Sequence, residues 1–208
     1  MSSDGYRFTV DWFSGHIPLF NVLLDQIKPS RILEIGSFEG RSSCYFVEKL
    51  APVTGGELHC VDTWQGGIEH QIGSPAAADM ESVESRFDHN ISYQKAQHHA
   101  VSVHKHKMRS VEALAGLLAS KGGSYFDVVY IDGSHQAPDV LTDAVLAYYL
   151  VRKGGLLAFD DYLWGLHPQH DYFHVPKGGI DAFTNVFQRK VVPLSANLYQ
   201  LYLQKIED

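Results

Sequence analysis

Three aspartates that stand directly after two short apolar runs could bind a cation. Asp132 follows the run 126–131. Asp160 and Asp161 follow the run 156–159. If both runs are neighbouring strands of a parallel sheet, their ends lie about 5 Å apart, and three carboxylates there repel one another unless a cation or protons intervene. Because Mg²⁺ prefers oxygen ligands, the pattern predicts a site for a hard divalent cation. The alternative is that one aspartate caps a helix and another faces water.

A histidine three positions after Asp132 has the chemistry of a proton acceptor. His135 stands at the start of a predicted helix. An imidazole titrates near pH ~6.5 and can act as a general base toward a hydroxyl held by a metal. We therefore treat His135 and Asp132 as catalytic candidates. The alternative for His135 is a neutral residue that is bonded to the backbone at the helix start.

A glycine-containing turn after the first predicted strand is suited to hold a ligand. Gly36 and Gly40 let the backbone approach a bound molecule, and the helix that follows offers free N–H groups. Ser37 stands where a dinucleotide-binding turn has its second glycine, which argues against a nicotinamide cofactor. Glu34 suits a ligand with an ammonium group, and Asp62, at the end of the next strand, can accept hydrogen bonds from ribose hydroxyls. Together these residues favour an adenosine-type ligand over a plain tight turn beside a surface acid.

The elements that position these residues alternate between short β-rich runs and longer helical patterns. Strands are predicted at 31–35, 57–61, 101–108, 126–131, 156–159, 191–194 and 197–204. Helices are predicted at 12–27, 41–50, 76–89, 111–119, 138–151 and 180–189. This order indicates an α/β, Rossmann-like, doubly wound and mostly parallel sheet. The last strand is expected to be antiparallel, because its connection is too short for a crossover. We expect one domain over residues 1–208, with a helical extension at 1–30 and the core at 31–208.

Composition excludes several classes of function. The 208 residues include 17 Lys and Arg against 24 Asp and Glu, and the net charge of −7 repels nucleic acids. The most apolar helical stretch, 140–151, is shorter than the ~18 residues of a membrane span and contains Asp143. Cys44 and Cys60 fit neither a disulfide framework nor a zinc-binding spacing. The N-terminus does not have the pattern of a secretory signal. We expect a cytoplasmic protein without nucleic-acid or membrane partners, either monomeric or homo-oligomeric.

The strand-end residues resemble class I S-adenosylmethionine-dependent methyltransferases, and within them the cation-dependent O-methyltransferases of the catechol and macrolide-sugar types. The glycine turn, LEIGSFEGRSS at 33–43, is similar to the first motif of that family. The most specific match is IDGSH at 131–135 followed by KGGLLAFDDY at 153–162. The resemblance covers 31–205 and implies a seven-stranded sheet, S-adenosylmethionine and Mg²⁺ or another hard divalent cation as cofactors, and a hydroxyl of a small molecule, of sugar or natural-product type, as acceptor.

The resemblance also implies roles for single residues. It makes Asp132, Asp160 and Asp161 the metal ligands. It places Glu34 near the methionine end of the cofactor, Asp62 at the ribose and Ser110 beside the adenine. The full cofactor-binding set that it implies is Glu34, Gly36, Ser37, Phe38, Gly40, Ser42, Asp62, Thr63, Trp64, Ser110 and Asp132.

This chain departs from the family pattern at two positions. The catechol-type enzymes have Asp-Asn where this chain has Asp160 and Asp161, and a lysine base where it has His135. The aspartate pair matches the sugar-modifying branch instead. Two alternatives remain, a hydroxylase-like oxygenase on the same fold and a catalytically silent cofactor-binding protein.

Two long segments at the ligand edge, 64–75 and 162–177, are expected to shape an acceptor pocket. They carry rings that could stack on a sugar or an aromatic group, with ordinary packing as the alternative: Trp64, Tyr162, Trp164 and Tyr172. The sequence His-Lys-His-Lys at 104–107 lies on a strand that the fold makes an edge, where charged side chains discourage pairing with another sheet.

Overall fold

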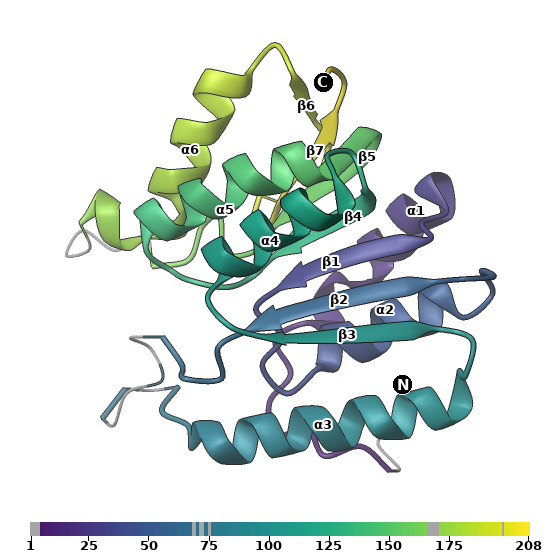
Figure 1. Ribbon diagram of the computed structural model, residues 1–208. Coiled ribbons are helices and arrows are strands. Elements are labelled where there is room, and N and C mark those ends of the chain that lie inside the picture. The colour runs from purple at the N-terminus through teal and green to yellow at the C-terminus, as the bar shows by residue number, and fades with distance from the viewer. Residues whose placement is uncertain (1–4, 68–69, 71–72, 75, 166–170, 197) are drawn as a thin grey trace.

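The protein is described by a computed structural model that covers residues 5–67, 70, 73–74, 76–165, 171–196 and 198–208. Within these residues the strands form one seven-stranded sheet, in the order β3-β2-β1-β4-β5-β7-β6 (Figure 1). The strands are β1 (Arg31–Ile35), β2 (Glu57–Asp62), β3 (Ser102–Lys107), β4 (Phe126–Ile131), β5 (Val151–Phe159), β6 (Val191–Pro193) and β7 (Leu201–Lys205). The first five are parallel, and β7 runs antiparallel to both β5 and β6. The predicted doubly wound fold is confirmed.

Helices cover both faces of the sheet (Figure 1). They are α1 (Ile17–Ile27), α2 (Arg41–Leu50), α3 (Met80–Gln97), α4 (Ser110–Lys121), α5 (Ala137–Leu150) and α6 (Pro176–Phe187), with short 3-10 helices η1 (Ser14–His16) and η3 (Tyr172–His174). One apolar core joins the sheet to α1, α2 and α3, with Phe20 and Phe46 at its centre. The other joins it to α4, α5 and α6 through Leu114 and Phe183. No helix among the described residues is long and apolar enough to cross a membrane.

Helix α3 is shifted toward the C-terminus relative to the predicted 76–89 and ends at Gln97. The hydrophobic spacing in the sequence does not continue to this end, because two buried positions in the second half of α3 are polar. Asn90 donates a hydrogen bond to the Glu39 carbonyl at 2.9 Å, and Gln94 donates to the Cys44 carbonyl at 3.1 Å. These bonds let the helix stay buried beyond the point where hydrophobic spacing would end it.

Strand β5 begins earlier than predicted, at Val151, so residues 152–155 are strand rather than a helix stop. Gly154 has a φ of 78°, and the register with β4 shifts between Phe126 and Val128. Arg152 lies at this irregularity and donates to Asp127 at 2.5 Å. Gly154 therefore lies within an irregular part of β5 and does not end a helix. Helix α5 ends at Leu150 without a glycine cap.

The topology places the candidate residues at one edge of the sheet. The chain runs from β1 to β2 and β3 on one side and then crosses to β4 and β5 on the other (Figure 1). A crevice forms at the carboxyl ends of the strands where the winding direction changes, and open α/β sheets bind their ligands there. Ile131 of β4 is paired with Phe159 of β5, which makes Asp132 and Asp160 neighbours.

Candidate functional site

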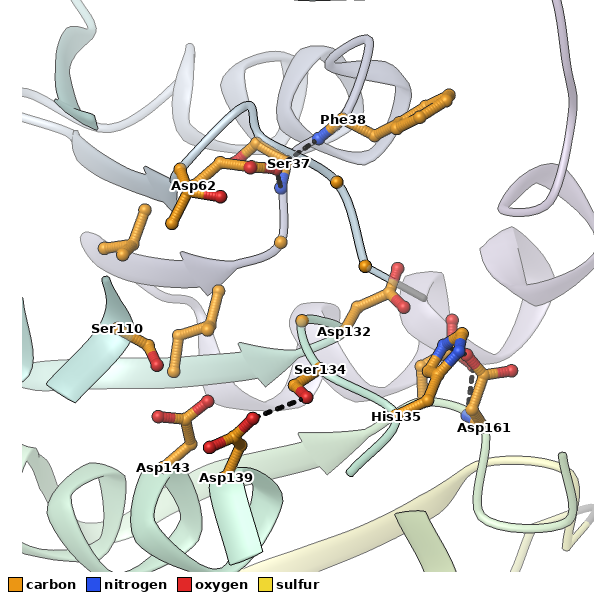
Figure 2. Close-up of a pocket in the computed structure, with 18 of the residues that line it drawn as sticks. Ser37, Phe38, Asp62, Ser110, Asp132, Ser134, His135, Asp139, Asp143 and Asp161 are labelled. Atoms are coloured by element: carbon orange, nitrogen blue, oxygen red, sulfur yellow. Dashed lines mark hydrogen bonds and ion pairs between the residues drawn. The ribbon is translucent and has the colours of Figure 1, made fainter. Parts of the chain in front are cut away.

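A cavity of about 1110 Å³ opens at the carboxyl ends of β1, β2, β4 and β5. It is large enough for a nucleoside-sized cofactor together with a small acceptor. Figure 2 shows acidic groups in two places on its wall, with Asp132 and Asp161 beside His135 at one end, and Asp139 and Asp143 near Ser110 at the other. The predicted site residues that line it are Gly36, Ser37, Phe38, Ser42, Asp62, Thr63, Ser110, Asp132, His135, Asp160 and Asp161.

The glycine turn is held against the end of β4. Gly36 has a φ of 86°, and a Cβ atom there would lie 1.8 Å from the Asp132 carbonyl oxygen. That carbonyl is backbone, which cannot rotate out of the way, so only glycine fits. The turn and the loop that carries Asp132 are thus packed backbone to backbone.

Asp62 fixes the other side of the turn. Its Oδ2 accepts hydrogen bonds from the backbone N–H groups of Ser37 and Phe38, both at 2.9 Å (Figure 2). Its Oδ1 accepts from the backbone N–H of Trp64 at 2.7 Å. A carboxylate offers about four acceptor positions, and three are used here. Asp62 lines the cavity, and the residues that the structure describes leave one of these positions open to a ligand.

The three aspartates predicted to bind a metal come together. One carboxylate oxygen of each lies within 4.8 Å of those of the other two. The Tyr130 hydroxyl is 2.6 Å from Asp160 Oδ2 and 3.1 Å from Asp132 Oδ2. Gln200 donates to Asp160 Oδ1 at 2.8 Å.

The charge of this acid cluster, Asp132, Asp160 and Asp161, is only partly compensated. The single proton of the Tyr130 hydroxyl can serve one carboxylate at a time. Burial, and then the repulsion of the neighbouring aspartates, raises the pKa of Asp132 well above its ordinary value and also raises the pKa of Asp160. The cluster therefore takes up either protons or a cation.

His135 lies beside the acid cluster. Its Nε2 is 2.9 Å from Asp161 Oδ2, and its ring packs on Trp164 with the centroids 4.2 Å apart. The Tyr199 hydroxyl donates to the other oxygen of Asp161 at 3.0 Å. The imidazole is thus oriented by a carboxylate, as a proton-transferring histidine requires.

A family model described as a methyltransferase domain matches residues 33–162, more than half of the chain. The chain belongs to this family. The resemblance of the sequence to S-adenosylmethionine-dependent methyltransferases is confirmed, and the site described above lies largely within the matched segment.

Solved structures share the fold of this methyltransferase. The O-methyltransferase from Bacillus cereus, in complex with SAH, has a TM-score of 0.66 and 18% identity over 95% of this chain and 84% of that chain. TomG, the O-methyltransferase from Streptomyces achromogenes involved in tomaymycin synthesis, in complex with SAM, has a TM-score of 0.63 and 20% identity over 95% and 82%. MycE from the mycinamycin pathway, in complex with Mg, SAH and mycinamycin VI, has a TM-score of 0.59 and 17% identity over 95% and 51%.

Sequence similarity to a curated protein is confined to a short segment. An uncharacterized protein of Acanthamoeba polyphaga mimivirus, R132, is 50% identical over 36 residues. This segment is 17% of the methyltransferase and 16% of the viral protein.

The end of the cavity away from the acid cluster contains acids that the sequence analysis did not assign to the site. Asp143 of α5 lines the cavity although it is only 2% exposed, and burial raises its pKa to about 7. Ser110 hydrogen-bonds to it and opposes this shift. Ser134 donates to Asp139 at 2.8 Å (Figure 2). The position of Asp143 within the apolar stretch 140–151 could have indicated its place in the site, because buried acids gather at functional sites.

The N-terminal segment also contributes to the wall, through Val10, Trp12 and Phe13. Arg41 donates to the Val10 carbonyl at 3.0 Å, and the Trp12 ring packs on Phe38 with the centroids 5.2 Å apart. The N-terminal extension is therefore part of the site's enclosure.

Three of the residues that the resemblance assigned to the cofactor do not line the cavity: Glu34, Gly40 and Trp64. Glu34 is 0% exposed and accepts hydrogen bonds from the hydroxyls of Ser37, at 2.7 Å, and Ser43. Burial raises the pKa of Glu34. These hydrogen bonds tie the Glu34 carboxylate to the glycine turn and to α2, and its role toward the cofactor stays a prediction.

Gly40 and Trp64 take part in the packing around the glycine turn, and their contact with a cofactor stays a prediction. Gly40 begins α2 with a φ of 80°, and a Cβ atom there would meet Phe87 at 2.9 Å. Trp64 donates from its indole nitrogen to the Phe38 carbonyl at 2.9 Å and packs on Phe87. Of the other predicted stacking rings, Trp164 lines the cavity, whereas the hydroxyls of Tyr162 and Tyr172 both donate to Asp181.

Proposed function

We propose that this methyltransferase transfers the methyl group of S-adenosylmethionine to a hydroxyl oxygen of a small molecule, with the help of a divalent cation. The observation that carries this proposal is the convergence of three carboxylates within 4.8 Å on the wall of the cavity. The acceptor class that we propose is a sugar or a natural-product scaffold. Aromatic side chains at the cavity, Trp12, Trp164 and Tyr199, offer faces on which such a ring can stack.

The donor set of the acid cluster fits Mg²⁺ or another hard divalent cation. All of its candidate ligands are carboxylate oxygens, the type that Mg²⁺ prefers. Burial, and then mutual repulsion, raises the pKa values of Asp132 and Asp160, and such a cation would relieve the repulsion. When bound, the cation supplies positive charge that lowers the pKa of the acceptor hydroxyl.

The side chains at the cavity orient the acceptor hydroxyl and the methyl donor and take up the proton of the acceptor. His135 accepts the proton of the acceptor hydroxyl, and Asp161, 2.9 Å away, stabilises the imidazolium that forms. The acceptor oxygen then forms a bond to the methyl carbon while the carbon–sulfur bond breaks, and its electron pair stays on sulfur in S-adenosylhomocysteine. Because the sulfonium is a reactive donor, much of the rate comes from holding the two reactants in line.

The adenosine part of the cofactor is proposed to lie between the glycine turn and Ser110. Gly36, Ser37 and Phe38 form one wall of this space, and the free acceptor position of Asp62 faces a ribose. Asp143 and Ser110 lie at its far end, where a protonated carboxyl can donate to a ring nitrogen and an ionised one can accept from an exocyclic amino group. The SAM or SAH in the three related structures supports S-adenosylmethionine as the cofactor.

The test is a screen of hydroxyl acceptors that measures S-adenosylhomocysteine formation by chelator-treated protein with and without added Mg²⁺. We expect turnover with at least one sugar or natural-product acceptor and its loss without the cation. Binding of S-adenosylhomocysteine with no turnover across the panel would favour the catalytically silent alternative. Product that forms only with iron and oxygen would favour the hydroxylase-like alternative.

A further inference from the structure

A second group of potential metal ligands lies on the body of the sheet, away from the cavity. Glu57 and His59 of β2 and His104 of β3 each offer one ligand atom within 4.8 Å of the other two. His59 and His104 are register partners on adjacent strands, and β3 is the edge strand (Figure 1). None of these three described residues lines the cavity. We call them the histidine cluster.

The centre of the histidine cluster is a buried nitrogen. His59 is 2% exposed, and its Nε2 has no hydrogen-bond partner among the residues that the structure describes. A buried polar atom without a partner is energetically unfavourable. The same Nε2 lies 3.6 Å from Glu57 Oε2, which is too long for a hydrogen bond. Two ligands at 2.0–2.1 Å from one tetrahedral ion would be about 3.4 Å apart, close to this separation.

The neighbouring side chains hold these ligands in the form that binds a metal. His59 Nδ1 lies 3.0 Å from His106 Nε2. With its proton on Nδ1, His59 donates to His106 and keeps the Nε2 lone pair directed at the cluster, the arrangement found for metal-bound histidines. The Tyr125 hydroxyl donates to Glu57 at 2.6 Å and fixes the carboxylate.

We propose that Glu57, His59 and His104 bind Zn²⁺, with water in the remaining coordination position. Two imidazoles and a carboxylate are a donor set that Zn²⁺ accepts, whereas Mg²⁺ is bound mainly by oxygen. His104 is exposed, which opens a path for the ion from solvent. The ion joins β2 to the edge strand β3, and because it binds the folded chain it stabilises the protein.

The test is a titration of chelator-stripped protein with Zn²⁺, followed by calorimetry and by thermal unfolding. We expect one Zn²⁺ per chain at this cluster, a rise in melting temperature with Zn²⁺, and no such rise with the same concentration of Mg²⁺. His104→Ala should weaken Zn²⁺ binding at least about tenfold and remove the rise. Because His104 is exposed, this variant should melt like the wild type without metal. The matched control is His99→Ala, which changes another exposed histidine and should bind Zn²⁺ as the wild type does.

A second variant separates this site from the acid cluster. Asp160→Asn should retain the binding that His104→Ala weakens. Co²⁺ gives a further readout, because a tetrahedral ion with imidazole ligands has strong visible absorption bands, which should be absent in His104→Ala and present in Asp160→Asn. The proposal is wrong if Zn²⁺ affinity is unchanged in His104→Ala or is lost in Asp160→Asn alone.

Discussion

The acid cluster and the histidine cluster are built from the same sheet, yet their positions suit them to different ions. The acid cluster stands just beyond the ends of β4 and β5 and lines the cavity. The histidine cluster lies within β2 and β3, on side chains that the register brings opposite one another. Strand ends open into space that a substrate can enter, whereas side chains within a sheet meet only one another. The first position favours chemistry on a ligand, and the second favours a structural ion.

The two clusters also differ in charge. Burial and mutual repulsion raise the pKa of Asp132 and Asp160, so a cation compensates charge that is otherwise unfavourable. Burial lowers the pKa of His59, so this ring is neutral, and a metal there satisfies a nitrogen rather than a charge. The following variants separate these two roles, from the largest expected effect to the smallest.

Asp160→Asn should lower turnover by about a thousandfold. Asparagine keeps the size of the side chain but removes a carboxylate from the acid cluster. Binding of S-adenosylhomocysteine should stay within about threefold of wild type, since Asp160 lies away from the glycine turn. Initial rates of product formation and calorimetry measure the two quantities. The control is Asp25→Asn at an exposed position of α1 that does not line the cavity, which should leave both unchanged. Normal turnover by Asp160→Asn would contradict the metal role.

Gly36→Ala should disrupt the close packing of the glycine turn against the loop that carries Asp132 of the acid cluster. The added methyl group would lie 1.8 Å from the Asp132 carbonyl oxygen, at a φ of 86°. We expect a loss of about 3 kcal/mol in the free energy of unfolding, and loss of S-adenosylhomocysteine binding. Gly116→Ala is the matched control, because a Cβ atom there meets nothing within 4 Å inside α4. It should stabilise the protein by roughly 0.5–1 kcal/mol. Equal stability of the two variants in denaturant unfolding would show that the close approach is not required.

Asp143→Asn tests an acid that belongs to neither cluster. Burial raises the pKa of Asp143 to about 7, from 3.8 in the unfolded chain. Between these values the folded state holds a proton that the unfolded state has released, so stability falls as pH rises from about 4 to about 7. From pH 5 to pH 8 the wild type should therefore lose roughly 2 kcal/mol more than Asp143→Asn. Urea unfolding at both pH values measures this difference, and identical pH profiles would contradict it.

Tyr199→Phe should have the smallest effect. It removes the hydroxyl that donates to Asp161 at 3.0 Å, while the ring stays at the cavity. Mg²⁺ affinity should fall by about tenfold or less, because this residue orients a ligand without binding the ion itself. Zn²⁺ binding at the histidine cluster should not change. Mg²⁺ titration calorimetry measures the effect, and a loss of affinity much larger than tenfold would mean that Tyr199 is itself a ligand.

The acid cluster could be predicted from sequence, because the carboxyl ends of neighbouring parallel strands must meet. The alternation of strands and helices predicted a parallel sheet. If the strands before Asp132 and Asp160 are neighbours, as the structure shows, the three aspartates must lie close together. The histidine cluster could not be predicted in this way. It depends on the register of β2 with β3, and no local pattern around His104 and His106 specifies which residue stands opposite His59.

The direction in which single side chains point also could not be predicted from the sequence. Glu34 and Trp64 were predicted to bind the cofactor, and the sequence did not indicate that both side chains are buried in the packing around the glycine turn. The serine hydroxyls that satisfy Glu34 come from the turn and from α2, and only the folded chain brings them together. The contribution of Trp12 was missed for a similar reason, since it reaches the cavity from the far end of the chain.

The most direct test of the central claim is a titration of S-adenosylhomocysteine into chelator-stripped protein by calorimetry, with NAD⁺ as the control and with Mg²⁺ added in a separate experiment. We predict micromolar binding of S-adenosylhomocysteine, no binding of NAD⁺, and a Mg²⁺ binding heat that disappears in Asp132→Ala. Failure to bind S-adenosylhomocysteine would contradict the assignment of the cavity to methyl transfer. A Mg²⁺ heat that persists in Asp132→Ala would contradict the assignment of the acid cluster to the cation.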